Sequence, residues 1–305
     1  MENKDQNILD GAIVRTVAYF DIFDYPLTEV EIYRFLFGHT EDGCARKINQ
    51  SLAKGLPGIE EKKGFYFLPG RAEIVNTREE RAGWSERKFA LARRVAFLFR
   101  LIPWIRFVGV ANIMGQKNLR EDGDIDFFII TEAKKIWLTR FFANVITQLL
   151  GLRPKPQDVR DKICLSFFVS EDALNLEKLM LPGDIYFIYW LVGLEPVYQT
   201  GGIYGRLLAA NLWIKKYLPN WHPQLLPEDQ KKSRLYHGII DFFLGSSEAF
   251  FKKIQLRLMP EEIRREANRS TNVIINDEVL KFHTNDRRQL FKDRWNKKIK
   301  DETAQ

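Results

Sequence analysis

The stretch Asp124-Ile125-Asp126-Phe127-Phe128-Ile129-Ile130 places two carboxylates at the start of an apolar run. In a β-strand, residues two positions apart lie on the same face, so the pattern predicts that Asp124 and Asp126 meet at one end of a buried strand. Two carboxylates held this close repel each other unless a cation lies between them, and oxygen ligands suit a hard divalent ion such as Mg²⁺. The stretch therefore indicates a metal site suited to phosphate chemistry.

A second apolar run, Arg106-Phe107-Val108-Gly109-Val110-Ala111-Asn112, ends in a turn-prone residue and is joined to the first by a polar connection. Strand, tight turn, short linker and Asp-x-Asp strand together resemble the core of the nucleotidyltransferase superfamily typified by DNA polymerase beta. The resemblance implies a small mixed-sheet α/β (α+β) domain that uses Mg²⁺ or Mn²⁺ and takes an NTP as substrate. It assigns Asp124 and Asp126 as catalytic metal ligands, and Gly109, Asn112 and Ile113 as residues of the nucleotide-binding turn. No Gly-Ser or Gly-Gly pair is present at that turn.

The superfamily pattern also implies a third carboxylate from a later strand, which completes a two-metal site. The natural strand runs from Lys162 to Val169 and holds no acid, with Ser166 near the expected position. Acids flank this strand instead: Asp158, Asp161, Glu171 and Asp172. Three alternatives stay open: a flanking acid joins the site, one metal suffices, or the site is a binding or structural remnant. The sequence therefore leaves open whether the protein is an enzyme.

Composition gives the frame for these motifs. The chain has 305 residues, which favours two or three domains, and its net charge of +7 favours an anionic partner such as ATP, tRNA, DNA or an acidic membrane surface. Of the two cysteines, Cys164 lies in an apolar run and is expected to be a buried structural thiol. The first residues lack a signal peptide and the apolar segments are too short to span a bilayer, so we expect a cytoplasmic protein without a membrane partner.

Other common catalytic classes lack their motifs in this chain. No serine lies in a nucleophile elbow, and neither a P-loop nor a dinucleotide-binding fingerprint is present. The four histidines are far apart and show no metal-ligand spacing. Hydrolase, P-loop and dehydrogenase functions are therefore disfavoured.

Residues 1–72 predict three helices followed by a hairpin that turns near Lys63-Gly64. Thr28 followed by Glu31 is a capping-box signature for the second helix. Three helices and a hairpin are typical of a winged-helix module, whose basic side chains could contact nucleic acid. Because Glu60 and Glu61 dilute the charge of the hairpin, packing on a neighbouring domain is the alternative. The candidate DNA-contacting residues are Arg46, Lys47, Lys54, Lys62 and Lys63.

Residues 73–200 form the expected nucleotidyltransferase-like domain, with helices over 72–101 and 136–150, and residues 201–305 form a helical carboxyl-terminal region. Its basic tail, 285–300, is expected to be a surface helix, and nucleic-acid contact is the alternative. The function favoured by the resemblance is metal-dependent transfer of a nucleoside monophosphate from an NTP to a small molecule, a protein or an RNA end. The competing hypothesis is a non-catalytic regulator that senses a nucleotide or binds DNA. An acid beside Asp124 and Asp126 would discriminate between them.

Overall fold

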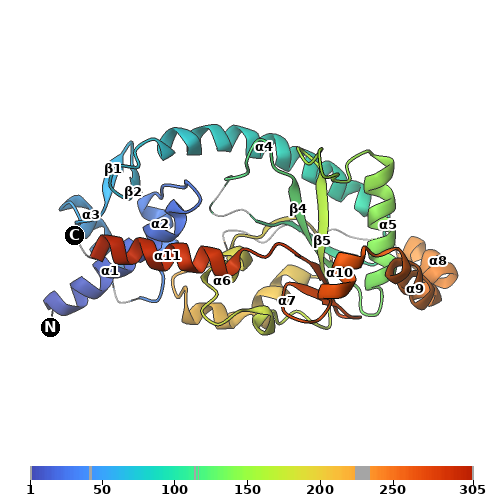
Figure 1. The fold of residues 1–305 in the computed structure, drawn as a ribbon. Coiled ribbons are helices and arrows are strands. Elements are labelled where there is room, and N and C mark those ends of the chain that lie inside the picture. The colour runs from blue at the N-terminus through green and yellow to red at the C-terminus, as the bar shows by residue number, and fades with distance from the viewer. Residues whose placement is uncertain (1, 41–42, 113–114, 116, 224–233, 304–305) are drawn as a thin grey trace.

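The computed structural model describes the whole chain except residues 1, 41–42, 113–114, 116, 224–233 and 304–305. Ile113, which the sequence assigned to the nucleotide-binding turn, lies outside the described residues. Helices dominate the two ends of the chain, and a mixed sheet lies between them (Figure 1). The α+β class expected from the sequence is therefore confirmed.

A six-stranded sheet is the largest sheet of the described residues, with strand order β6-β3-β4-β5-β8-β7. Only β4 and β5 run parallel, and every other neighbouring pair in this sheet is antiparallel. The strand bounds are β3 (Ile105–Val110), β4 (Ile125–Thr131), β5 (Ile163–Ser170), β6 (Glu195–Gln199), β7 (Val273–Ile275) and β8 (Val279–Phe282). The central strands β3, β4 and β5 match the apolar runs from which the sequence predicted them.

Helices cover both faces of this sheet because its central strands are apolar on both sides. One face packs on α4 (Ile74–Phe99), α5 (Ile136–Leu149) and α9 (Glu248–Leu258). The other packs on α6 (Ile185–Val192) and α7 (Ile203–Ala210). Asp126 belongs to the second face, since it lies two residues before Phe128, whose ring meets Trp190 of α6 at 5.5 Å.

The amino-terminal elements follow the predicted order of three helices and a hairpin. They are α1 (Glu2–Asp21), α2 (Glu29–Phe35), α3 (Cys44–Ala53), β1 (Glu60–Lys62) and β2 (Phe65–Phe67). The capping box is confirmed, because Thr28 and Glu31 each cap the other's backbone N–H. Tyr19 of α1 stacks on Tyr189 of α6 at 4.3 Å, so this module packs directly against the sheet-covering helices. Its assignment as a winged helix stays a prediction.

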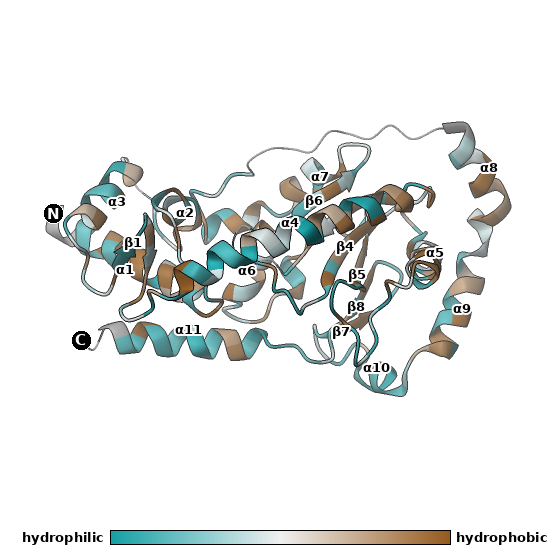
Figure 2. Cartoon of the chain, turned by 90° about the horizontal axis from the view of Figure 1, so that it is seen from above, coloured by the Kyte–Doolittle hydropathy of each residue, from teal (hydrophilic) through white to brown (hydrophobic). Residues whose placement is uncertain are grey.

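The carboxyl-terminal region is helical as expected, yet it also completes the sheet. Besides α7 and α9, its helices in the described residues are α8 (Arg234–Leu244), α10 (Glu261–Glu266) and α11 (Arg288–Thr303), with 3₁₀ turns at Leu212–Lys216 and Gly245–Ser247. A further 3₁₀ turn, Glu177–Leu179, precedes the region. Strand β8 pairs with β5, and β7 pairs with β8. In Figure 2, α11 runs as a largely hydrophilic helix along one long edge of the molecule, back toward the amino-terminal module. No helix of the described residues is long and apolar enough to cross a membrane.

Candidate metal centre

Asp124 and Asp126 lie at the start of β4, as their spacing predicted. Asp126 is the second residue of the strand and Asp124 directly precedes it. The backbone here is fixed on both sides: the carbonyl of Asp126 accepts a hydrogen bond from Ala111 N at 2.8 Å, and Ile125 N donates to the carbonyl of Lys162 at 2.8 Å. The two half-buried carboxylates therefore share one end of the sheet.

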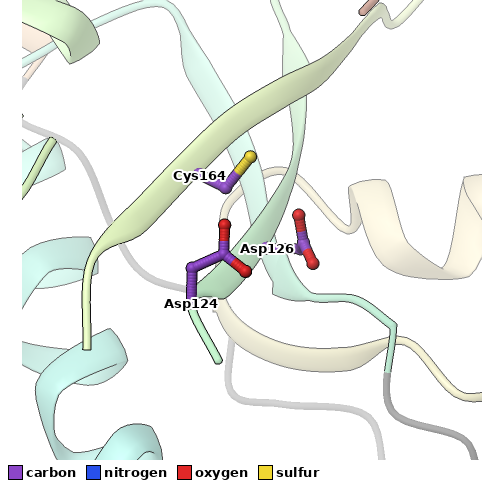
Figure 3. Close-up of side chains that lie close together, drawn as sticks. All are labelled: Asp124, Asp126 and Cys164. Carbon is purple, nitrogen blue, oxygen red and sulfur yellow. The ribbon is translucent and has the colours of Figure 1, made fainter. Parts of the chain in front are cut away.

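The third member of the site is Cys164 on β5, where the sequence predicted only a structural thiol. In the parallel register, Cys164 is the partner of Asp126. Ligand atoms of Asp124, Asp126 and Cys164 all lie within 4.8 Å of one another, a spacing that a single ion can bridge. Figure 3 shows the carboxylate of Asp124 and the thiol of Cys164 close together, with the carboxylate of Asp126 beside them. Two oxygens and one sulfur could thus hold one divalent ion.

None of the acids that flank β5 joins this group in the described structure. Asp158 pairs with Lys162 at 3.0 Å, and Asp161 pairs with Lys88 at 2.8 Å. Glu171 and Asp172 follow the far end of β5, because Cys164 is the second residue of that strand and Ser170 its last. The hydroxyl of Ser166 lies 3.0 Å from Nε2 of His283. The candidate acids named from the sequence are therefore engaged elsewhere or lie at the far end of β5.

Burial and mutual repulsion control the protonation of the site. Burial, followed by the charge of Asp124, raises the pKa of Asp126 to about 6. Burial likewise raises the pKa of Asp124, and burial together with both carboxylates raises that of the Cys164 thiol. Each shift disfavours negative charge, so a bound cation would stabilise the charged forms that these groups otherwise resist.

Asn112, one of the residues predicted at the nucleotide-binding turn, positions Asp126. Its backbone is left-handed, with φ of 58°, a conformation that Asn tolerates better than most residues. Its side-chain amide donates to Oδ2 of Asp126 at 2.6 Å, and its carbonyl oxygen accepts from the hydroxyl of Tyr186 at 2.9 Å. The hydrogen-bonded series Tyr186–Asn112–Asp126 thus joins α6 to the candidate metal ligands.

Gly109, also predicted at that turn, lies within β3 and is not among the residues that line the cleft described below. A Cβ at this position would lie 2.7 Å from the ring of Phe107. That ring stacks on Tyr204 of α7 at 5.4 Å. The structure therefore gives Gly109 a packing role, because the ring of Phe107 occupies the space that a side chain would need.

A buried lysine fixes the two loops that lead into β4 and β5. Lys88 of α4 is fully buried and donates to the carbonyl of Gly123, the residue before Asp124. The same ammonium group pairs with Asp161, whose backbone N–H donates to the carbonyl of Gly123 at 3.2 Å. The ammonium group of Lys88 thus anchors both loops that lead to the site, a role that no motif in the sequence predicted.

The site opens into a cleft of about 720 Å³ between the sheet, α6, α11 and the end of α1. In the described part of the chain, six arginine or lysine side chains and four carboxylates line this cleft. His283 adds no charge near pH 7, because burial and the neighbouring Lys281 lower its pKa to about 4. A cleft of this size with a cationic surplus suits a small anionic ligand whose charge a metal ion could share.

No family model, curated protein or solved structure matches the chain.

Proposed function

We propose that the protein is a metal-dependent nucleotidyltransferase whose site is formed by Asp124, Asp126 and Cys164. The observation that carries this proposal is the convergence of these three side chains, within 4.8 Å, at the wall of a cationic cleft. A divalent ion held there would neutralise phosphate charge and act as a Lewis acid at phosphorus. Mg²⁺ or Mn²⁺ suits the two carboxylates.

In the proposed reaction, an acceptor hydroxyl attacks the α-phosphorus of an NTP. The new bond joins the acceptor oxygen to that phosphorus, the bond from that phosphorus to the bridging oxygen of the β-phosphate breaks, pyrophosphate leaves, and the hydroxyl proton passes to solvent. Within the protein, Asn112 orients the carboxylate of Asp126 through its 2.6 Å hydrogen bond. The cationic side chains of the cleft bind and orient the phosphates, which supports the negative charge of the transition state.

A second candidate function, nucleotide sensing without catalysis, is favoured by the chemistry of Cys164. A neutral thiol in place of a third carboxylate removes one negative charge from the group of residues that could hold the ion. A two-metal reaction loses charge stabilisation when one ligand is absent, and each 1.4 kcal/mol lost costs about tenfold in rate. Binding of an NTP without transfer is the expected behaviour of such a sensor.

The test incubates the protein with each labelled NTP, Mg²⁺ or Mn²⁺, and a cell extract as a source of acceptors. Wild type is compared with the Asp124→Ala, Asp126→Ala double variant and with Asp122→Asn as the matched control. Asp122 lies in the same loop but is exposed and pairs with Arg120. Transfer of label that needs both aspartates and survives Asp122→Asn supports the enzyme. NTP binding without transfer supports the sensor, and absence of NTP binding contradicts both.

A further inference from the structure

Helix α11 and the residue directly before it, Arg287, present one aromatic and two cationic side chains to the cleft. Phe291 stacks on Tyr186 at 5.0 Å, with only 13° between the ring planes. Arg287 precedes it by four positions and Arg294 follows by three, so the three residues share one face of the helix. All three line the cleft that contains Asp124 and Asp126.

The cations on this face differ from Arg288, which also lines the cleft, in having no partner within the described residues. Arg288 is buried and pairs with Asp184 at 3.0 Å, so its charge is already used inside the protein. Arg287, Arg294 and Lys297 are exposed, and within the described residues no side-chain hydrogen bond or ion pair engages any of them. Their charges are therefore available to a ligand.

These free cations continue beyond the cleft. Arg294 also lines a neighbouring hollow of about 330 Å³, together with Lys297. Three carboxylates also line that hollow: Asp21 pairs with Lys298, Asp24 pairs with Arg71 at 2.6 Å, and Asp301 lies beyond Lys297 on the helix. From Arg287 to Lys297 the helix rises by about 15 Å, which is longer than one triphosphate needs.

We propose that this face of α11, formed by Arg287, Phe291, Arg294 and Lys297, binds the end of a single-stranded nucleic acid. Cations that follow a phosphate backbone, with an aromatic ring among them on which a base can stack, are the shared features of single-strand binding sites. One end of this face lies at the cleft that contains Asp124 and Asp126, so only the terminus of the nucleic-acid strand needs to enter that cleft. The inference rests on the proposed function and gives its acceptor as the terminal hydroxyl of that strand, whose proton passes to solvent.

The test measures fluorescence anisotropy of labelled 12-nucleotide RNA and DNA strands with the full chain, without metal or NTP. The Arg287→Gln, Arg294→Gln variant should weaken binding at least tenfold and flatten the slope of log K against log salt by about one to two. Phe291→Leu should weaken binding severalfold at every salt concentration, because it removes stacking and no charge. Thermal unfolding confirms that each variant is folded.

The matched control is Lys253→Gln, Arg257→Gln, which removes the same charge from exposed positions on α9, at the opposite end of the molecule. This pair should bind the strands as wild type does. Equal losses in both double variants, no strand binding at low salt, or binding only to anionic lipid vesicles would overturn the proposal. Manganese titration distinguishes a failure of strand binding from a failure of the proposed function. Mn²⁺ binding that persists in the α11 variant shows that the metal site is intact, whereas absence of Mn²⁺ binding in wild type contradicts the proposed function.

Discussion

At the scale of single residues, the buried carboxylate of Asp126 has a cost in stability that the proposed metal ion would offset. Its pKa of about 6 exceeds the value of about 3.9 for an unfolded chain. Between these two values the folded state holds a proton that the unfolded state has released. The free energy of unfolding of the metal-free protein therefore falls as pH rises from about 4 to about 6.

Asp126→Asn should remove this dependence. Near pH 7 we expect the metal-free variant to be more stable than wild type, by on the order of 2 kcal/mol, because the buried charge and its repulsion with Asp124 are gone. Mn²⁺ should stabilise wild type and leave the variant unchanged. Urea unfolding at pH 4.5 and pH 7, with and without Mn²⁺, measures both effects. An identical pH dependence in the two proteins would contradict the assignment.

Cys164 should determine which ion the site prefers. Sulfur favours Zn²⁺ and Co²⁺, whereas three carboxylates favour Mg²⁺ and Mn²⁺. We expect Cys164→Asp to strengthen Mg²⁺ binding by about tenfold, or about 1.4 kcal/mol, and to weaken Zn²⁺ binding. Cys164→Ser, which adds no charge, is the control and should weaken Zn²⁺ binding only.

Calorimetric titration gives these affinities, and Co²⁺ gives a direct signature. A thiolate-to-cobalt absorption band in the near ultraviolet should be present in wild type and absent from both Cys164 variants. Cobalt binding without that band would show that the carboxylates hold the ion alone.

The two aspartates were predictable because their relation is local: a strand sets residues two apart on one face. Cys164 was not, since its place beside Asp126 depends on the parallel register of β4 and β5. The packing of both strands between helices sets that register, and this packing cannot be read from a single sequence. The turn-prone character of Asn112 was readable, but its bond to Asp126 was not.

At the scale of elements, α4 and the two loops beneath it form one unit through Lys88. Lys88→Met should leave the carbonyl of Gly123 and the carboxylate of Asp161 without their buried partner. We expect a loss of about 1–3 kcal/mol in the free energy of unfolding, since hydrogen bonds to charged groups contribute in this range. Mn²⁺ binding should weaken as well, because the loop that carries Asp124 loses its anchor.

The control is Arg87→Met, next in the chain, whose side chain is about half exposed and contacts the same Asp161 at 3.2 Å. It should have little effect on either quantity, as is usual for exposed ion pairs. If both variants lose stability equally, the buried ammonium group has no special role.

The sequence revealed elements that were long, or that were joined by a recognisable turn, as β1 and β2 are at Lys63-Gly64. The helix expected over 136–150 is α5, and the one expected over 72–101 is α4, both long enough to show their period. Strands β7 and β8 have three and four residues, too few for an alternating pattern. They form because β5 offers an open edge, which is a property of the sheet and not of residues 273–282.

At the scale of the whole molecule, Arg288 joins segments that are distant in sequence. Its guanidinium pairs with Asp184 at the start of α6 and with Asp286 at 2.8 Å, and it donates to the carbonyl of Leu179 and the hydroxyl of Thr271. This hub fixes the first turn of α11 against the cleft. The carboxyl-terminal region is thus bound into the centre of the protein.

Arg288→Met should destabilise the protein by about 3–5 kcal/mol, since it leaves the buried carboxylate of Asp184 without its cation, while Asp286 keeps Lys281 at 3.2 Å. Early loss of α11 should appear as faster amide exchange in residues 288–303 and faster proteolysis there. Arg294→Met, on the exposed face of the same helix, is the matched control and should change neither. Uniform exchange in both variants would contradict the role of the hub.

The pairing of β8 with β5 also has a consequence for synthesis of the chain. Strand β5 leaves the ribosome long before residues 279–282, so its outer edge has no partner until the protein is almost complete. An apolar strand with an open edge is prone to pair with other chains, and the nascent protein must pass through this stage. A chain that stalls before β8 should therefore remain sensitive to protease and bind chaperones, and the candidate metal site, one of whose three side chains lies on β5, should form only after release.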